Sequence, residues 1–93
     1  MMRTTRKDAE RAFERLVRTL GGRIARNYND IGAFQFDYNS TYGGCRVELI
    51  INSGGGVRCP FGMERLTPAA FVQAVSFTCD VLHEQEAQRR AVA

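Results

Sequence analysis

The chain has 93 residues, of which 44% are hydrophobic and 25% charged, and its net charge at pH 7 is +3. This length allows one hydrophobic core, so we predict a single domain over residues 1–93, with 1–4 and 89–93 loosely held. The composition excludes a disordered tail, and no apolar run approaches the roughly 20 residues of a membrane span. The mild positive charge permits contact with nucleic acid or with an acidic protein but does not require it.

The N-terminal residues and the cysteines indicate the compartment. Arg3, Arg6 and Lys7 are followed by an amphipathic charged segment, not by the apolar run of a secretory signal. The three cysteines include no Cys-x-x-Cys pair, which is typical of reduced thiols and not of a disulfide framework. We therefore expect a cytoplasmic protein.

A helix is predicted from Thr5 to Leu20, because Thr5 and Asp8 resemble a capping box and Gly21 provides a stop. The apolar residues of this segment recur at spacings of three and four: Ala9, Phe13, Leu16, Val17 and Leu20. Its opposite side carries Lys7, Arg11, Arg15 and Arg18, with Glu14 among them. We interpret this side either as a solvated face with a Glu14 to Arg18 pair, or as a positive stripe that meets phosphate or acidic side chains.

Three antiparallel strands are expected next, joined by short turns as a meander. They are Ala33–Tyr38, Cys45–Asn52 and Val57–Phe61. Alternation predicts that their core-facing residues are Phe34, Phe36 and Tyr38, then Cys45, Val47, Leu49 and Ile51, then Val57, Cys59 and Phe61. Pro60 makes the last strand an edge strand. A weak fourth strand over 23–28 would have Ile24 as its only strong apolar anchor.

A second helix is predicted from Thr67 and Pro68 to about Gln88. Its core face would consist of Phe71, Ala74, Val75, Thr78, Val81 and Leu82. The order of elements predicts an α+β fold, with both helices packed on one face of a three- or four-stranded antiparallel meander. The other face of the sheet is expected to stay open and to carry Gln35, Asp37, Arg46, Glu48, Ile50 and Arg58.

No group of residues predicts catalysis. Cys79 and His83 could meet on one helix face as a nucleophilic pair, but nothing nearby supplies an orienting partner. A zinc site would need Cys45, Cys59, Cys79 and His83 at a long, irregular spacing. The glycines at 54–56 indicate a hairpin turn and not a phosphate loop, since no Gly-Lys-Ser/Thr follows. We expect no catalytic residue, cofactor or metal, and hence no enzyme.

The order helix, three strands, helix resembles the double-stranded RNA-binding domain. This resemblance implies contacts to duplex RNA from the first helix, a loop between strands and the start of the second helix. However, the second helix opens with residues 67–71, Thr-Pro-Ala-Ala-Phe, where that family carries lysines. Arg58 and Arg65 are the basic residues nearest to this helix start, and two arginines do not replace a cluster of lysines. Nucleic-acid binding is the alternative function that follows.

Several short motifs resemble those of small uncharacterised proteins from tailed bacteriophages and prophages. They are Tyr28-Asn29, Tyr42-Gly43-Gly44, Pro60-Phe61-Gly62 and the helix from Thr67. The resemblance implies an accessory protein that binds and blocks a host protein, including components of bacterial defence such as CRISPR effector complexes. It implies no catalytic residue.

Partner contacts are expected from two sources. One is the basic stripe of the first helix, Arg11, Arg15 and Arg18, and the other is a set of aromatic residues outside the core pattern. Phe77 lies off the apolar stripe of its helix, and the turn tyrosines offer apolar area with a hydrogen-bonding tip. The expected contact residues are Arg11, Arg15, Arg18, Tyr28, Tyr42 and Phe77. The alternatives are a Phe77 covered by a loop, tyrosines that cap the core, and a homodimer built on Phe77 and an exposed edge strand.

Overall fold

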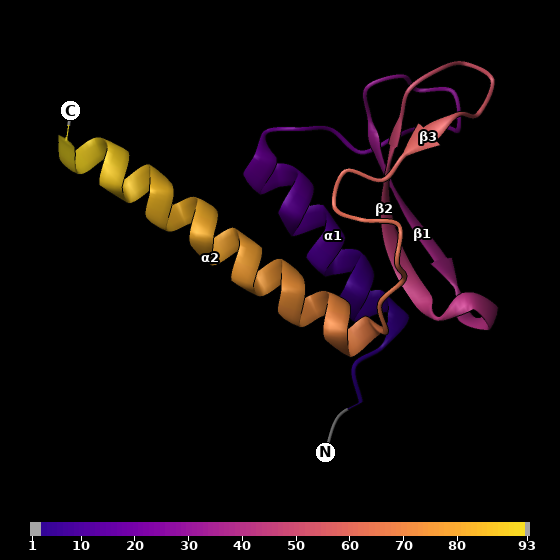
Figure 1. Ribbon diagram of the computed structural model, residues 1–93, viewed down its shortest axis with the longest axis horizontal. Coiled ribbons are helices and arrows are strands. Elements are labelled where there is room, and N and C mark those ends of the chain that lie inside the picture. The colour runs from indigo at the N-terminus through magenta and orange to yellow at the C-terminus, as the bar shows by residue number, and fades with distance from the viewer. Residues whose placement is uncertain (1–2, 93) are drawn as a thin grey trace.

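The computed structural model describes residues 3–92, which fold as helix, three strands and helix (Figure 1). The elements are α1 (Arg6–Leu20), β1 (Phe34–Asn39), a 3-10 turn (Ser40–Tyr42), β2 (Gly44–Ile50), β3 (Val57–Arg58) and α2 (Pro68–Val92). The strands form one antiparallel sheet in the order β1-β2-β3. The predicted α+β class and the meander are confirmed.

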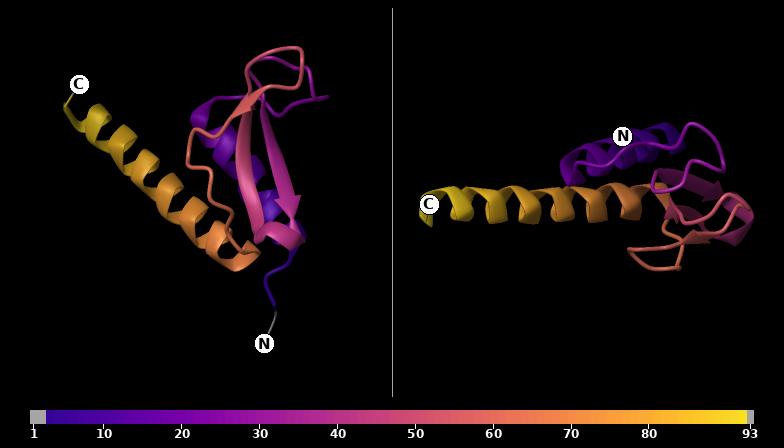
Figure 2. Two further views of the ribbon diagram at one scale, coloured as in Figure 1. Left: turned by 45° about the vertical axis from the view of Figure 1, so that its right-hand side comes forward. Right: turned by 90° about the horizontal axis from the view of Figure 1, so that it is seen from above.

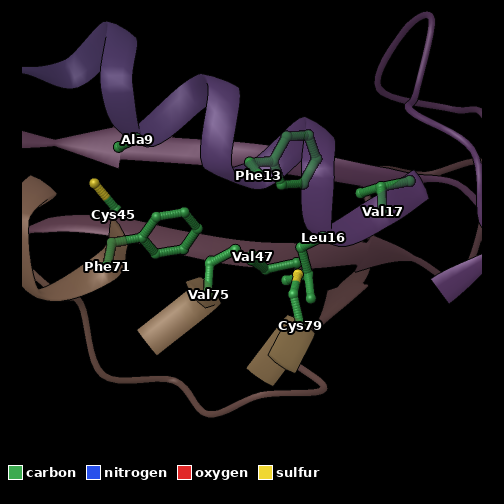
Figure 3. Packing of buried hydrophobic residues seen from close by; sticks show 9 residues of the cluster. All are labelled: Ala9, Phe13, Leu16, Val17, Cys45, Val47, Phe71, Val75 and Cys79. Atoms are coloured by element: carbon green, nitrogen blue, oxygen red, sulfur yellow. The ribbon is translucent and has the colours of Figure 1, made fainter. Parts of the chain in front are cut away.

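Both helices lie on one face of the sheet, start near the same end and run in the same direction (Figures 1 and 2). The core lies between the helices and the sheet (Figure 3). Its buried members are Ala9, Phe13, Leu16, Val17, Cys45, Val47, Phe71, Val75 and Cys79. The ring of Phe36 joins the layers, with centroids 5.7 Å from Phe13 of α1 and 5.6 Å from Phe71 of α2.

α1 begins and ends as its sequence predicts. The backbone N–H of Thr5 donates to Asp8 Oδ2 at 2.9 Å, and the N–H of Asp8 donates to Thr5 Oγ1 at 3.2 Å, which is a capping box. The hydrogen bond from the Thr5 backbone holds the pKa of Asp8 below its ordinary value. Gly21 ends the helix at a φ of 72°, a conformation that glycine adopts without strain.

β3 is shorter than the predicted Val57–Phe61 because of Pro60. Continuing the register that pairs Leu49 with Arg58 would place Pro60 opposite Val47, where a proline has no N–H to donate. The chain leaves the sheet edge here and returns at Leu66, which pairs with Cys45 through two backbone hydrogen bonds of 2.6 and 2.9 Å. We call residues 59–65 the arch.

The predicted facing of β3 was wrong, and so was the predicted burial at the end of β2. Arg58 lies opposite Leu49 and Val57 opposite Ile50, so Val57 shares the face that points away from the helices. Ile50, expected to be exposed, is only 1% exposed, whereas Ile51 is exposed. A difference of one residue in register exchanges the two faces of a strand. Phe61, in the arch, is exposed as well and does not join the core.

Two segments differ from their predicted lengths. Residues 23–28 make a single parallel bridge, from Ile24 to Phe34, and so do not form a fourth strand. α2 continues past Gln88 to Val92, supported by ion pairs of Glu86 with Arg89 and Arg90. The end of α2 projects beyond α1 (Figure 2). Of the termini expected to be loosely held, residues 1, 2 and 93 lie outside the described chain.

Neither described helix combines the length and the apolar character that crossing a membrane would need.

Candidate protein-binding site

A cavity of about 170 Å³ lies between β2, α2 and the arch. Core residues form its apolar walls, among them Leu16, Val47, Phe71 and Val75. Other lining residues come from the arch and its end, and from α2: Phe61, Gly62, Glu64, Leu66, Ala74 and Thr78. The cavity exists because the chain leaves the edge of β2 at Pro60 and does not pair with it again until Leu66.

Exposed apolar side chains line this cavity or follow its lining residue Ala74 along α2. Phe77 is 73% exposed, Phe61 is 54% exposed and Val81 is half exposed. Ala74, Phe77 and Val81 are spaced by three and four residues and therefore adjoin one another on α2, while Ala74 also lines the cavity with Phe61 and Leu66. We call these residues the apolar patch: Phe61, Leu66, Ala74, Phe77 and Val81. Contiguous apolar surface of this kind marks interaction sites.

The core face of α2 is narrower than predicted. Only Phe71, Val75 and Cys79, one residue per turn, are buried on this helix. α1 lies on one side of α2 and the arch on the other (Figure 2), so the burial is confined to the line that faces the core. Ala74 and Val81, which were expected in the core, lie outside this line and are exposed, as is Phe77. Of the two alternatives for Phe77, a covered or an uncovered ring, the structure shows the uncovered one.

Two arginines fasten the arch to the sheet. Arg65 forms an ion pair with Asp37 of β1 and donates to the Gly44 carbonyl at 3.2 Å. Arg46 of β2 donates to the Met63 carbonyl at 3.4 Å. The side chain of Arg65 is only 13% exposed. The sequence contained no signal for this role, because nothing local relates residue 65 to a carboxylate 28 positions earlier.

The sheet face away from the helices carries a bonded polar network instead of an open surface. Glu48 is buried and accepts hydrogen bonds from Gln35 at 2.8 Å and from Arg46 at 2.7 Å. The bond to Glu48 raises the pKa of the Arg46 guanidinium. Such charge-assisted bonds favour a fixed geometry. These side chains form hydrogen bonds with each other, and Arg46 also bonds to the arch. We therefore do not assign a partner to this face.

The structure does not bring the six expected contact residues together. Arg11 and Arg15 line a groove between α1 and α2, and Arg15 lies 3.9 Å from Asp80. Tyr28 and Tyr42 lie beyond opposite ends of β1, at 70% and 72% exposure, and do not cap the core. Arg18 is exposed further along α1. No Glu14 to Arg18 ion pair is formed; α1 pairs Arg6 with Glu10 instead.

The cysteines do not form a reactive or metal-binding group. The thiol of Cys79 is buried and donates to Thr19 Oγ1 at 3.6 Å, while His83 is exposed one turn later. Burial raises the pKa of the Cys45 thiol, which disfavours its nucleophilic thiolate form. Over residues 3–92, no group of three or more His, Cys, Asp and Glu side chains is placed to hold a metal ion.

The end of the molecule where both helices begin was the other candidate site. The starts of α1 and α2 lie close together there, beside Arg3, Arg6 and Tyr38. The first turn of α2 consists of proline, alanines and phenylalanine, and so offers no charged side chain to a phosphate.

Comparison of the chain with protein-family models, curated proteins and solved structures found no match.

Proposed function

We propose that this protein is a non-enzymatic binding protein that occupies the surface of another protein through the apolar patch. The observation that carries this proposal is the exposure of Phe61, which lines an apolar cavity, and of Phe77 and Val81, which adjoin the lining residue Ala74 on α2. Large apolar side chains beside a pocket are the usual anchors of protein interfaces, because their burial removes much apolar area from water. The same exposure would be costly in a protein without a partner.

The turn motifs at Tyr28-Asn29 and Tyr42-Gly43-Gly44 support a host protein as the partner. Their resemblance to phage accessory proteins favours a role in blocking that protein, with a component of bacterial defence, such as a CRISPR effector complex, as the target we propose. The free thiols of Cys45, Cys59 and Cys79 are compatible with action in the reducing host cytoplasm.

The test compares Phe77→Ala with Tyr42→Ala, since the two aromatic residues are exposed to nearly the same extent, 73% and 72%. The wild-type chain is used to capture a partner from host cells, and the purified partner is then titrated with each variant by calorimetry. We expect Phe77→Ala to weaken binding at least about tenfold and Tyr42→Ala to change it little. Equal binding by wild type and Phe77→Ala would refute the patch as the interface.

A second copy of the chain is a competing occupant of the apolar patch. Sedimentation equilibrium separates the two cases, because a monomer has a mass of 10.4 kDa. We expect a monomer at micromolar concentration, with the patch free for a different protein. A dimer that Phe77→Ala dissociates would assign the patch to self-association instead.

Nucleic-acid binding is the second candidate, favoured by two observations. The element order is the one that the resemblance to the double-stranded RNA-binding domain covers, and Lys7, Arg11 and Arg18 are exposed on α1. This function predicts a complex with duplex RNA that weakens steeply with salt. A gel shift at low salt without a complex would eliminate it.

A further inference from the structure

The backbone of Val47 lies at the edge of β2 that faces the arch. Cys45 pairs with Leu66 and Leu49 lies opposite Arg58, and Val47 stands between them on the same two-residue period. The N–H and C=O of Val47 therefore face the same edge of β2. Within the described chain, no backbone hydrogen bond reaches Val47 from the arch, because the chain leaves the edge of β2 before it comes opposite Val47.

This open backbone position is withdrawn from solvent. Val47 is only 6% exposed, and it lines the cavity together with Phe71 and Val75. Buried backbone donors and acceptors are nearly always paired, with water or a ligand where protein supplies no partner. The cavity wall thus combines apolar side chains with one main-chain donor and one acceptor that lack a strand partner.

The volume of the cavity limits the size of the side chain that can enter it. A volume of about 170 Å³ is close to that of a cavity of roughly 150 Å³ that admits benzene. One aromatic ring fits such a space. The charged lining residues are of both signs, Arg46 and Glu64, which favours a guest without net charge.

We propose that the cavity receives one neutral aromatic side chain with a hydrogen-bonding group, a tyrosine, presented by the protein that docks on the apolar patch. Its ring packs among Leu16, Phe71 and Val75, and its hydroxyl group, which can donate and accept, pairs with the backbone of Val47. This inference rests on the proposed function, since the ring comes from the bound partner. Phe61 and Ala74 flank the entrance and contact the segment that carries the ring.

The probe is N-acetyl-tyrosinamide, titrated into the ¹⁵N-labelled 93-residue chain and followed by NMR. We expect saturable shifts at the amides of Val47, Leu66 and Val75. N-acetyl-phenylalaninamide, which keeps the ring but lacks the side-chain hydrogen-bonding group, should bind about fivefold more weakly. A probe that shifts only Tyr28 and Tyr42, or no saturable shift up to the solubility limit, would overturn the proposal.

Two matched variants test the location. Ala74→Phe should fill the cavity mouth and weaken probe binding at least tenfold, while Ala87→Phe places the same side chain on the exposed, projecting part of α2 and should leave binding unchanged. Thr78→Leu, also at the cavity, replaces Ala74→Phe if that variant misfolds. Equal binding by the cavity variant and the control refutes the cavity. Loss of partner binding in Phe77→Ala without probe binding would retain the proposed function and reject this inference alone.

Discussion

Thr5 and Asp8 form the first turn of α1 through reciprocal hydrogen bonds, so the charge of one carboxylate bears on the stability of a helix that supplies four buried residues. Arg6, the next residue in the chain, places its guanidinium 4.8 Å from the ring centroid of Tyr38 and thereby links this end of α1 to β1. Fraying of the first turn would therefore disturb contacts beyond the helix itself.

Asp8→Asn should destabilise the protein at pH 7, and the difference from wild type should shrink in acid. The pKa of Asp8 lies below 3.8 in the folded state and near 3.8 in the unfolded chain. Its carboxylate thus stabilises the fold fully above pH 3.8, and this contribution is lost as the pH falls through the lower, folded value. Urea unfolding at pH 7 and pH 3 measures the effect. Glu10→Gln, which removes an exposed ion pair with Arg6, is the control and should show little change at either pH.

Gly44, the first residue of β2, allows the backbone of Leu66, which follows the arch, to come close to the strand. Its φ is +118°, and a Cβ added there would collide with the Leu66 carbonyl, which accepts a hydrogen bond from Cys45. Gly55, in the hairpin turn, has a φ of +87° but open space around it. An added Cβ would cause backbone strain at both glycines but a steric collision only at Gly44, so the two substitutions distinguish these effects.

Gly55→Ala should cost about 1 to 2 kcal/mol, the penalty for a left-handed conformation at a residue with a Cβ. Gly44→Ala should cost more, because the pairing of Leu66 with Cys45 must also shift. Chemical denaturation of both variants measures the two free energies of unfolding. Equal losses would mean that the Leu66 segment moves away without cost, and would contradict the close packing at this point.

At the scale of elements, the arch replaces the expected second half of β3. Pro60 prevents the ladder from continuing, and the segment is held instead by Arg65, Arg46 and the pairing of Leu66. A strand in this place would have closed the edge of β2. The arch leaves the cavity beside Val47 and holds Phe61 in solvent.

Arg65→Met should loosen the arch and lower the free energy of unfolding by about 1 to 3 kcal/mol, since Asp37 and the Gly44 carbonyl lose a partly buried partner. Amide hydrogen exchange of Cys45 and Leu66 should accelerate with it. Arg89→Met, which removes an exposed arginine from an ion pair on α2, is the matched control and should change neither quantity appreciably. Unchanged exchange at Leu66 in Arg65→Met would show that the backbone pairing holds the arch alone.

At the scale of the molecule, α2 has a different surface on each side. α1 lies on one side of α2 and the arch on the other (Figure 2). Arg11 and Arg15 line the groove on the first side, and Ala74 of the apolar patch lines the cavity with Phe61 on the second. An interface built on the patch would bury apolar area and set the lifetime of the complex, whereas the arginines would act through long-range attraction. The two contributions can be measured separately.

Replacing Arg11, Arg15 and Arg18 by Glu should slow association with an acidic partner and weaken the salt dependence of that rate, while the dissociation rate changes little. Surface plasmon resonance at two salt concentrations measures both rates. Phe77→Ala is the complementary variant and should act mainly on dissociation. Identical association rates for the triple variant and wild type, with the fold intact by circular dichroism, would exclude the basic stripe from binding.

Much of the fold was predictable because its signals are local. The capping box at Thr5, the stripe from Ala9 to Val17 and the alternation of Phe34, Phe36 and Tyr38 each depend on neighbours within one or two turns of chain. The exposure of Phe77 was predictable for the same reason, since the helical period places it off the buried line.

By itself, then, the sequence determined the α+β class, the meander, the ends of α1 and the start of α2. Only the tertiary structure decided the register of β3, the burial of Ile50, the arch with its Arg65 to Asp37 contact, and the cavity beside Val47. The physical reason is that hydrogen bonds and packing between residues far apart in the chain fix these features. A period of two or of 3.6 residues says which side chains share a face, but not what lies opposite that face.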